Sequence, residues 1–396
     1  MARIDQAIYL VAAVRTPIGK FGGGLASLTA AQLGTASAAA TLARSGIDPN
    51  AVDEVIFGNA RQAGVGPNVA RQIAVRSGLR HEVPAYTVNQ ACGSGLRAIM
   101  NAADQIRLGQ ASVVLAGGTE SMSNTPYLLT RARWGMRMGD GEVIDGMQRD
   151  GFMCPLADEM MGSTAETLAN QYKISREEQD RFAVESQTKA SRAYDEKRFA
   201  NEIVPVKVAG KKGETVIDRD EHPRFDATLD SMAKLEPVFR KKGTVHAGNS
   251  SGVTDGASSM LVASEIAVEK LVLKPMARIV GYAQAGVDPK IMGIGPVPAT
   301  RRLLDETGLT LDDIDLIELN EAFAAQVIAC DRELHFDAAK LNVHGGAIAL
   351  GHPIGCTGAR ITTTLLHALE SHGKKRGLAT LCISGGMGLS MIVERV

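Results

Sequence analysis

Val113-Val-Leu-Ala-Gly-Gly118 is a short apolar run that ends in two glycines, and Leu381-Cys-Ile-Ser-Gly-Gly386 follows the same pattern 268 residues later. A short apolar run bounded by a turn signal is typical of a buried strand. Paired glycines after a strand are common in α/β proteins, so further matches are needed before this similarity indicates a repeat.

Two further pairs of segments match in the same order along the chain. Asp53-Glu-Val-Ile-Phe-Gly-Asn59 resembles Asp315-Leu-Ile-Glu-Leu-Asn320, and Gly95-Leu-Arg-Ala-Ile99 resembles Gly358-Ala-Arg-Ile361. Their offsets of 261 and 263 residues are close to the first one. Three ordered matches at nearly constant spacing indicate two α/β halves of similar topology.

Within each half, short apolar runs alternate with helical patterns. Helical spacing relates five apolar residues of one segment, Leu96, Ile99, Met100, Ala103 and Ile106. This alternation favours a mostly parallel sheet with right-handed crossovers. The stretch 21–43 carries no charge, but its glycines and polar residues make it too weakly hydrophobic for a bilayer span, so we expect a buried Ala-rich helix.

The character of the sequence changes between the two halves. We expect an N-terminal half over residues 1–121 plus 252–275 and a C-terminal half over residues 276–396. Residues 122–251 would form an inserted loop domain with a charged amphipathic helix near 175–200. Loops on a rigid scaffold often bind substrate, so we expect substrate contacts in this segment.

The composition limits the class of protein. The chain has 396 residues, of which 45% are apolar and 22% charged, and its net charge is −1. These values are ordinary for a soluble globular protein and exclude a disordered or collagen-like chain. Without a basic excess we expect no nucleic-acid partner, and we expect no membrane partner. Five cysteines without a CxxC pair predict neither a zinc site nor a disulfide framework, which favours the reducing cytoplasm.

The first candidate site is Val88-Asn-Gln-Ala-Cys92-Gly-Ser-Gly-Leu96. A strand runs into glycines and then a helix, which places Cys92 near a helix N-terminus. There the helix dipole and the free N–H groups favour thiolate over thiol, so we expect Cys92 to be a nucleophile. A buried structural cysteine is the alternative, but the glycines would let a ligand approach the backbone closely.

The second candidate site is the glycine-rich stretch from Asn342 to Gly358, where the duplicate half should have its strand-to-helix turn. Because a pseudo-twofold relates the halves, we expect this turn to face the Cys92 turn. His352 is therefore a candidate base for the Cys92 thiol. His344 and Cys356 lie in the same stretch, and we expect them to be structural.

The third candidate site is Leu381-Cys-Ile-Ser384, where a buried strand would end in a glycine turn and expose the thiol of Cys382. Open backbone N–H groups in this turn could hold an oxyanion. Asn320, at the end of another strand of this half, adds an amide donor. Gly248-Asn-Ser-Ser-Gly252 fits the nucleophile elbow of serine hydrolases, but no separate oxyanion loop or helical context accompanies it.

Together these segments resemble the thiolase family over practically the whole chain, most of all its acetyl-CoA acetyltransferase members. The resemblance implies an α/β thiolase fold, with two duplicated βαβαβαββ-type halves in a five-layered α-β-α-β-α arrangement. It also implies an inserted loop domain that binds coenzyme A. The motifs that carry it are Asn89-Gln-Ala-Cys-Gly-Ser-Gly-Leu96, Gly117-Gly-Thr-Glu-Ser-Met122, Asn320-Glu-Ala-Phe323, Gly351-His-Pro-Ile-Gly355 and Cys382-Ile-Ser-Gly-Gly-Met-Gly388.

The resemblance implies a reversible Claisen condensation of two acetyl-CoA to acetoacetyl-CoA and CoA. Cys92 would take the acyl group as a thioester while His352 accepts its proton, and Cys382 would deprotonate the α-carbon of a second acyl-CoA. His352 with a water held by Asn320 would stabilise one oxyanion, and the backbone N–H groups of Cys92 and Ser384 the other. No metal and no cofactor beyond the substrate coenzyme A is expected, since every step is acyl or proton transfer.

The same resemblance implies residues for coenzyme A binding and for assembly. Ser251 is expected near the pantetheine arm, and Arg224 and Ser231 near the nucleotide end. The segment 131–139 lies where related enzymes carry a tetramerisation loop, so we expect a homotetramer built from tight dimers, or else a dimer with an exposed arm. The remaining candidate contacts to coenzyme A are Ala247, Met161 and Phe239.

Three positions depart from the family pattern. Met160 stands where many short-chain thiolases have a His that lines the acyl pocket, His344 replaces a common Asn, and Ser384 replaces a common Gly. The flexible side chain of Met160 could admit a longer acyl chain, so a broad-range degradative 3-ketoacyl-CoA thiolase is the alternative. A remote alternative is a non-catalytic CoA- or lipid-binding relative, which should have lost Cys92, His352 or Cys382.

Overall fold

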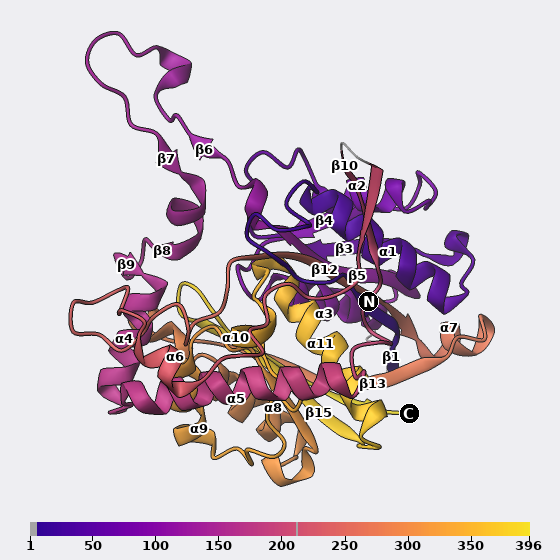
Figure 1. Ribbon diagram of the computed structural model, residues 1–396. Helices are drawn as coiled ribbons and strands as arrows, with labels where there is room; N and C mark the ends of the chain where they lie inside the picture. The colour runs from indigo at the N-terminus through magenta and orange to yellow at the C-terminus, as the bar shows by residue number, and fades with distance from the viewer. Residues whose placement is uncertain (1–5, 211–212) are drawn as a thin grey trace.

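The computed structural model describes residues 6–210 and 213–396 (Figure 1). Its centre is a ten-stranded mixed sheet with the strand order β14-β15-β16-β13-β1-β12-β5-β3-β4, in which β2 (Gly19–Lys20) pairs with β12. The antiparallel β1–β13 pair lies at the middle of this order. Strands on either side of that pair follow one another in equivalent order, so the sheet joins two similar halves.

The N-terminal half has the element order β-α-β-α-β-α-β-β. It consists of β1 (Ile8–Arg15), α1 (Ala30–Ser45), β3 (Glu54–Gly58), α2 (Val69–Arg76), β4 (Ala85–Val88), α3 (Ser94–Arg107), β5 (Val113–Ser121) and β12 (Thr254–Ser264). β3 runs parallel to β4 and β5, while β12 runs antiparallel to β5 and β1. The helix and strand predicted around Ile99 and Val113 are α3 and β5.

The C-terminal half repeats this order except at its third strand, after which it has one additional short helix. It consists of β13 (Pro275–Gly286), α8 (Pro296–Thr307), β14 (Leu316–Leu319), α9 (Ala324–Leu334), α10 (Ala347–Leu350), α11 (Ile354–Ser371), β15 (Arg376–Ile383) and β16 (Met387–Arg395). β14 runs parallel to β15, and a single parallel bridge from Leu341 to Ile317 takes the place of a further strand. The predicted duplication is confirmed.

An aspartate has the same structural role in each half. Asp53 directly precedes β3, and its Oδ2 accepts hydrogen bonds from two consecutive N–H groups at the start of β5, at 2.7 and 2.9 Å. Asp315 directly precedes β14, and its Oδ2 accepts from two consecutive N–H groups at the start of β15, at 2.9 and 2.8 Å. The repeat therefore preserves specific hydrogen bonds as well as the path of the chain.

Three large hydrophobic cores lie between five layers, and the central core extends over both faces of the middle layer. Helices α1 and α2 cover the outer face of the N-terminal strands, where Ile73 belongs to one core. Helices α3 and α11 form a buried middle layer, and Leu96 and Ile361 belong to the core that they share with both sets of strands. Helices α8 and α9 cover the outer face of the C-terminal strands, around Leu303. The predicted α-β-α-β-α arrangement is confirmed.

Helix α1 accounts for much of the charge-free stretch of the sequence. It begins at a capping box in which Thr29 and Gln32 each accept a hydrogen bond from the backbone of the other. Leu33 and Ala38 are fully buried, as expected for an Ala-rich core helix. Within residues 6–210 and 213–396, no helix is both long and apolar enough to cross a membrane.

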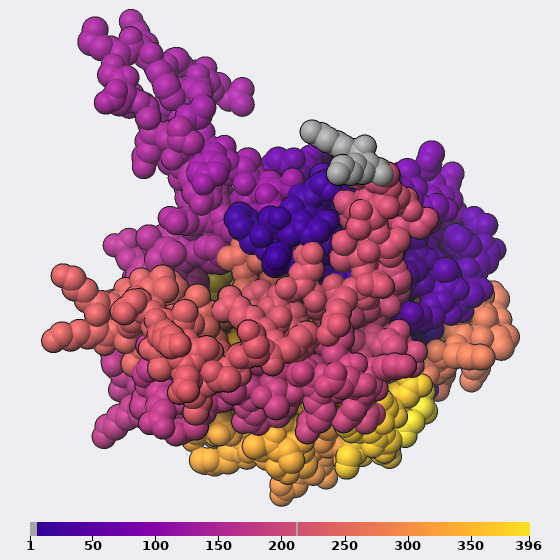
Figure 2. Space-filling model, in the orientation of Figure 1, coloured from indigo at the N-terminus to yellow at the C-terminus, as the bar shows by residue number. Residues whose placement is uncertain are grey.

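The segment between β5 and β12 extends from the layered body as an arm and then returns along its side (Figure 1). The arm contains β6 (Tyr127–Leu128) and β7 (Ile144–Asp145), and Figure 2 shows it projecting far beyond the rest of the surface.

The predicted charged helix is α5, which begins after the capping residue Ser175. The division of the chain at residues 121, 251 and 275 stays a prediction. The other elements of the segment are β8 (Met153–Cys154), β9 (Glu159–Met160), α4 (Met161–Gln171), α5 (Arg176–Asp195), β10 (Val206–Gly210), β11 (Gly213–Ile217) and α6 (Leu229–Ala233).

Candidate active site

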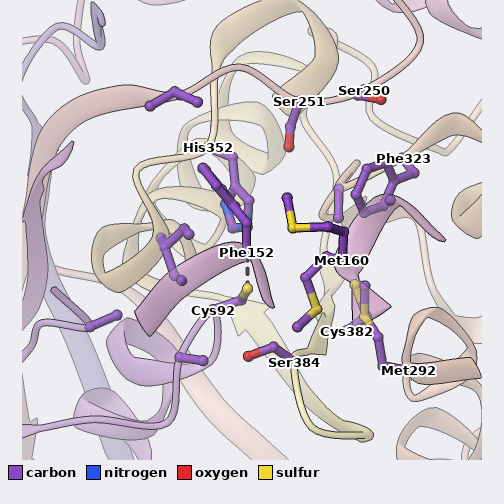
Figure 3. A pocket seen from close by; sticks show the side chains of 18 of the residues that line it. Cys92, Phe152, Met160, Ser250, Ser251, Met292, Phe323, His352, Cys382 and Ser384 are labelled. Atoms are coloured by element: carbon purple, nitrogen blue, oxygen red, sulfur yellow. Dashed lines mark hydrogen bonds between the residues drawn. The ribbon is translucent and has the colours of Figure 1, made fainter. Parts of the chain in front are cut away.

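A cavity lies where the Cys92 turn meets the His352 turn (Figure 3). Cys92 lies between β4 and α3, and His352 lies shortly before α11, so each half of the chain contributes one of them. The Nε2 atom of His352 is 3.3 Å from the Sγ atom of Cys92. The structure thus brings together the two side chains that the repeat predicted to face each other.

Two glycines allow the helices that carry these turns to approach. A Cβ atom on Gly95 of α3 would lie 2.7 Å from the backbone nitrogen of Ala359, and one on Gly358 of α11 would lie 2.2 Å from that of Leu96. Both distances are far inside van der Waals contact, so larger residues would force the helices apart. The first turns of α3 and α11 therefore meet backbone to backbone, which brings Cys92 to His352.

Thr357 fixes the orientation of the His352 ring from behind. Its Oγ1 atom lies 2.5 Å from Nδ1 of His352 and 3.0 Å from the carbonyl oxygen of Pro353. Because the hydroxyl donates its one proton to that carbonyl, it accepts from the imidazole, and Nδ1 carries the hydrogen. The Nε2 atom then presents its lone pair to the thiol of Cys92.

Burial keeps the Cys92–His352 pair neutral. Burial, together with the positive charges of Arg360 and Arg61, lowers the pKa of His352 to about 3. Burial also raises the pKa of Cys92 above its ordinary value of 9.0, although the backbone N–H of Ser384 and the charge of Arg61 oppose this shift. The local N–H groups lower the pKa of this thiol, as expected, but desolvation has the larger effect and the net shift is upward.

Two backbone N–H groups act on the sulfur of Cys92. They belong to Ser384 and to Cys92 itself, and both lower the pKa of this thiol. Paired N–H groups directed at one reacting atom are the usual construction of an oxyanion hole. The Ser384 donor is a backbone group, so the change from the common Gly to Ser leaves it in place.

Cys382 lies near the end of β15 and lines the same cavity as Cys92. Figure 3 shows it across the cavity from His352, beside Met160 and Met292. Its residue is only 1% exposed, so the prediction of an exposed thiol at the turn is wrong: packing around β15 shields the thiol from bulk solvent. Burial, and then the neighbouring Cys92, hold the pKa of Cys382 well above 9.0. Both thiols of the site are therefore protonated at rest.

Asn320 directly follows β14 and is fully buried. Neither its Oδ1 nor its Nδ2 atom has a hydrogen-bond partner among the described residues. A buried amide with both ends unpaired is costly unless a water or a ligand satisfies it. Asn320 is not among the residues that line the cavity, so the water expected from the resemblance would have to connect it to the substrate.

Glu120 accepts hydrogen bonds from both the turn after β3 and the His352 turn. The sequence analysis did not identify this residue. Its Oε1 atom accepts from the side chain of Asn59 at 2.7 Å and from the backbone of Arg61 at 3.0 Å. Its Oε2 atom accepts from the backbone of Ala60 at 3.0 Å and of Gly355 at 2.8 Å. Because Gly355 follows His352 closely, this carboxylate holds the His352 turn against the turn after β3.

Four of the six candidate coenzyme A contacts line the cavity, namely Met161, Phe239, Ala247 and Ser251. Arg224 and Ser231 lie outside it as exposed residues of the inserted segment. The hydroxyl of Ser231 donates to the carbonyl oxygen of Thr228 at 2.8 Å within the cap of α6. The roles of these six residues stay predictions.

The cavity has further lining residues that sequence reasoning missed. Arg61 comes from the turn after β3, Phe152 from a π-helical turn at Gln148–Phe152, and Met292 from a 3₁₀ turn at Pro289–Ile294. Arg61 lies two residues after Asn59, which is the counterpart of Asn320 in the repeat. The repeat could therefore have indicated that the turn containing Arg61 lies near the site. Met160, the departure from the family pattern, also lines the cavity.

Other residues singled out in the sequence have structural roles. The Nε2 atom of His344 lies 3.0 Å from that of a second imidazole, and burial lowers the pKa of His344 to about 3. Cys356 is buried within α11, which raises its pKa to about 12. Ser250 of the hydrolase-like pattern donates to the carbonyl oxygen of His246 at 2.8 Å, while the ring of His246 binds Asp180 at 2.7 Å. The hydroxyl of Ser250 thus faces a carbonyl oxygen and not an imidazole.

Comparisons with known proteins match both halves of the chain to one family. Residues 8–266 match the thiolase N-terminal domain, and residues 273–395 match the thiolase C-terminal domain. The chain is 52% identical to the acetyl-CoA acetyltransferase of Syntrophomonas wolfei, covering 99% of this chain and 100% of the relative. It is also 52% identical to the acetyl-CoA acetyltransferase of Escherichia coli, covering 98% of each chain.

Two solved structures superpose over nearly all of both chains. The acetyl-CoA acetyltransferase of Bacillus anthracis has a TM-score of 0.97 at 46% identity and covers 100% of each chain. Human mitochondrial 3-ketoacyl-CoA thiolase in complex with CoA has a TM-score of 0.96 at 44% identity, covering 100% of this chain and 99% of the human one. With both thiolase domains matched and the fold shared throughout, the chain belongs to the thiolase family.

Proposed function

We propose that this chain catalyses the reversible Claisen condensation of two acetyl-CoA molecules to acetoacetyl-CoA and CoA through an acyl thioester on Cys92. The observation that carries the proposal is the 3.3 Å contact between Cys92 Sγ and His352 Nε2 in a cavity that also contains Cys382. One thiol with an adjacent base suits acyl transfer, and a second buried thiol suits proton abstraction at carbon.

Acylation begins from two neutral thiols and a neutral imidazole. Nε2 of His352 takes the proton of Cys92 as its sulfur attacks the acetyl carbonyl of the first acetyl-CoA. The new C–S bond to Cys92 forms, the C–S bond to CoA breaks, and Cys382 gives its proton to the departing CoA thiolate. This step leaves acetyl-Cys92, an imidazolium at His352 and a thiolate at Cys382, so charge and protons balance.

Condensation then uses the base and the acid that acylation has made. The Cys382 thiolate removes a proton from the α-carbon of the second acetyl-CoA, while the His352 imidazolium stabilises the enolate oxygen. The carbanion attacks acetyl-Cys92, whose oxygen the N–H groups of Cys92 and Ser384 would hold. Collapse of the tetrahedral intermediate expels the Cys92 thiolate, which takes the proton from His352. Cys92, His352 and Cys382 are then all neutral again, as in the resting enzyme. Because a buried thiolate with a high pKa is a strong base, the raised pKa of Cys382 suits this role.

Thiolysis of acetoacetyl-CoA is the same path in reverse, with CoA as the second substrate. The relatives named above include a thiolase solved with CoA, and four predicted CoA contacts line the cavity. Ser251 would contact the pantetheine arm, while Arg224 and Ser231 would contact the nucleotide end at the surface. In this mechanism the chain needs no metal and no cofactor besides substrate coenzyme A.

A comparison of acyl chains tests the proposal and separates it from a broad-range 3-ketoacyl-CoA thiolase. Met160 lines the cavity with a flexible apolar side chain, which is the observation in favour of longer substrates. CoA-dependent cleavage of acetoacetyl-CoA and of 3-oxooctanoyl-CoA should be measured side by side, with Cys92→Ala as the blank. We expect a clear preference for acetoacetyl-CoA. Equal or better cleavage of the longer substrate would assign the broad-range activity, and no Cys92-dependent cleavage of either would reject both.

The arm supports the proposal of a homotetramer. Trp134 is 83% exposed and Met138 is 98% exposed at a part of the chain that projects from the body (Figure 2). Large exposed apolar residues on one segment mark an interaction surface. A Trp134→Asp/Met138→Asp double variant should sediment as a dimer at concentrations where the wild-type chain is a tetramer, whereas Val272→Asp, a change at another exposed apolar residue, should remain a tetramer. A wild-type chain that sediments as a dimer would contradict the proposal.

All five cysteines are free thiols, which agrees with the cytoplasm as the proposed compartment.

A further inference from the structure

Arg61 is the one Lys or Arg side chain among the described residues that line the cavity. It is 6% exposed, and its Nη1 atom donates to the carbonyl oxygen of Asp150 at 3.2 Å. Its Nε and Nη2 atoms have no hydrogen-bond partner among the described residues. The proposed mechanism does not use this side chain. A buried cation with idle donors is costly unless something satisfies it, so these two nitrogens need an explanation.

The two idle nitrogens form one edge of the guanidinium group. The Nε–H bond and one N–H bond of Nη2 point in the same direction and match the two oxygens of a carboxylate. Glu120 does not fill this edge, because its oxygens already accept four hydrogen bonds, of which Arg61 contributes only its backbone N–H. This edge therefore has the donor geometry to bind a carboxylate, but it is buried and becomes accessible only if the turn at Gly151 moves.

Apolar surroundings strengthen the electrostatic interactions of the Arg61 guanidinium group. This group also lies near the reacting side chains. The Cζ atom lies 5.7 Å from the centroid of the Phe152 ring, and most of the other lining residues are apolar. The charge of Arg61 lowers the pKa of both Cys92 and His352, so the guanidinium acts on both members of the pair. Asp150 is the acidic residue of the lining, but its side chain is 50% exposed and lies 3.5 Å from Arg149.

The guanidinium group of Arg61 lies directly against the backbone of Gly151. A Cβ atom at Gly151 would lie 2.1 Å from Nη2, 2.3 Å from Cζ and 2.6 Å from Nε of Arg61. Gly151 belongs to the π-helical turn Gln148–Phe152, and residues 148–150 of this turn are exposed, so few buried contacts hold it over the arginine. Single π-helical turns are frequent at functional sites. A carboxylate could displace this short turn and replace its contact with the guanidinium edge.

We propose that Arg61 binds the terminal carboxylate of a dicarboxylic acyl group carried on coenzyme A. This inference rests on the proposed function, because the other end of that acyl group would be the carbonyl that Cys92 attacks. The cavity volume of about 290 Å³ lies at the lower end for ligand pockets, so a short dicarboxylic chain is expected. The enzyme would then act on 3-ketoacyl-CoA substrates that carry a terminal carboxylate.

Succinyl-CoA and butyryl-CoA are the matched probes, since both acyl groups have four carbons and only one ends in a carboxylate. The rate of Cys92 acylation by each should be measured from the intact mass of the protein and from CoA release. We expect wild-type enzyme to prefer succinyl-CoA and the Arg61→Leu variant to lower the succinyl/butyryl rate ratio at least about 30-fold. Arg149→Leu makes the same change on a neighbouring exposed arginine and should preserve the ratio.

Gly151→Ala provides an independent test that keeps the charge of Arg61. Its added methyl group would press on the guanidinium group and displace it, so we expect it to lower the same ratio. This variant remains informative if Arg61→Leu does not fold. A wild-type ratio near one would overturn the proposal. So would an Arg61→Leu variant that slows both probes equally, since the arginine would then act on the thiol and not on the carboxylate.

Acetyl-CoA in the same series separates this inference from the proposed function. Acylation of Cys92 by acetyl-CoA without a preference for succinyl-CoA would reject the Arg61 site alone. If acetyl-CoA, succinyl-CoA and butyryl-CoA all fail to acylate Cys92, the proposed function and the Arg61 site are both rejected.

Discussion

Cys382→Ala will still form an acetyl thioester on Cys92, but it will condense that group with a second acetyl-CoA at least about 10³-fold more slowly. Once Cys92 is acylated, its sulfur can no longer accept a proton, and the His352 imidazolium is an acid. Among the described residues that line the cavity, Cys382 is then the one buried group that can remove the α-proton, because the carboxylate of Asp150 is half-exposed and lies 3.5 Å from Arg149. Acylation survives because a CoA thiolate can leave without a proton donor.

Two measurements on one sample show this separation. The mass of the intact protein reports the acetyl-enzyme, and the amount of acetoacetyl-CoA reports condensation. Cys356→Ala is the matched control, because it removes another buried thiol that lies within α11 and outside the cavity lining, and it should retain both steps. Condensation by Cys382→Ala at near the wild-type rate would show that another group removes the α-proton.

The similarity between the two halves of the sequence predicted the fold best, because it identifies pairs of residues that have equivalent positions in the two halves. The Asp53 and Asp315 matches predicted equivalent strands, and both side chains make equivalent hydrogen bonds to the next strand of the parallel pair. Gly95 and Gly358 predicted equivalent helix starts, and at these glycines the backbones of α3 and α11 come into close contact. The meeting of Cys92 and His352 could therefore be predicted without coordinates.

The protonation state of the site could not be predicted in the same way. A helix N-terminus is visible in the sequence, but the cost of burying a charge depends on every layer that covers the site. At Cys92 that cost outweighs the local N–H groups, so the pKa of the thiol is raised. Arg61 was missed for a similar reason: a lone arginine after a strand is usually solvated, and only the covering turn at Gly151 shows that it is buried.

His352→Ala will slow acylation of Cys92 by acetyl-CoA about 10²- to 10⁴-fold near neutral pH. It will also change the pH dependence of that step. In wild type, the pKa of His352 is about 3 and the pKa of Cys92 lies above 9.0. The imidazole is thus a free base and the thiol is protonated between these values, so the acylation rate should be nearly flat from about pH 5 to about pH 8.

Without the imidazole, the reaction must use the small fraction of Cys92 that is thiolate. That fraction rises about tenfold for each pH unit below the pKa of the thiol, so the rate of His352→Ala should rise by the same factor. Thr357→Val keeps the imidazole but removes the acceptor for its Nδ1–H, so it should cost only about 10- to 100-fold and retain the flat profile. A flat profile in His352→Ala would contradict the neutral resting pair if Cys92 is already a thiolate. If another group takes the proton of Cys92, it would contradict the role of His352 as the base.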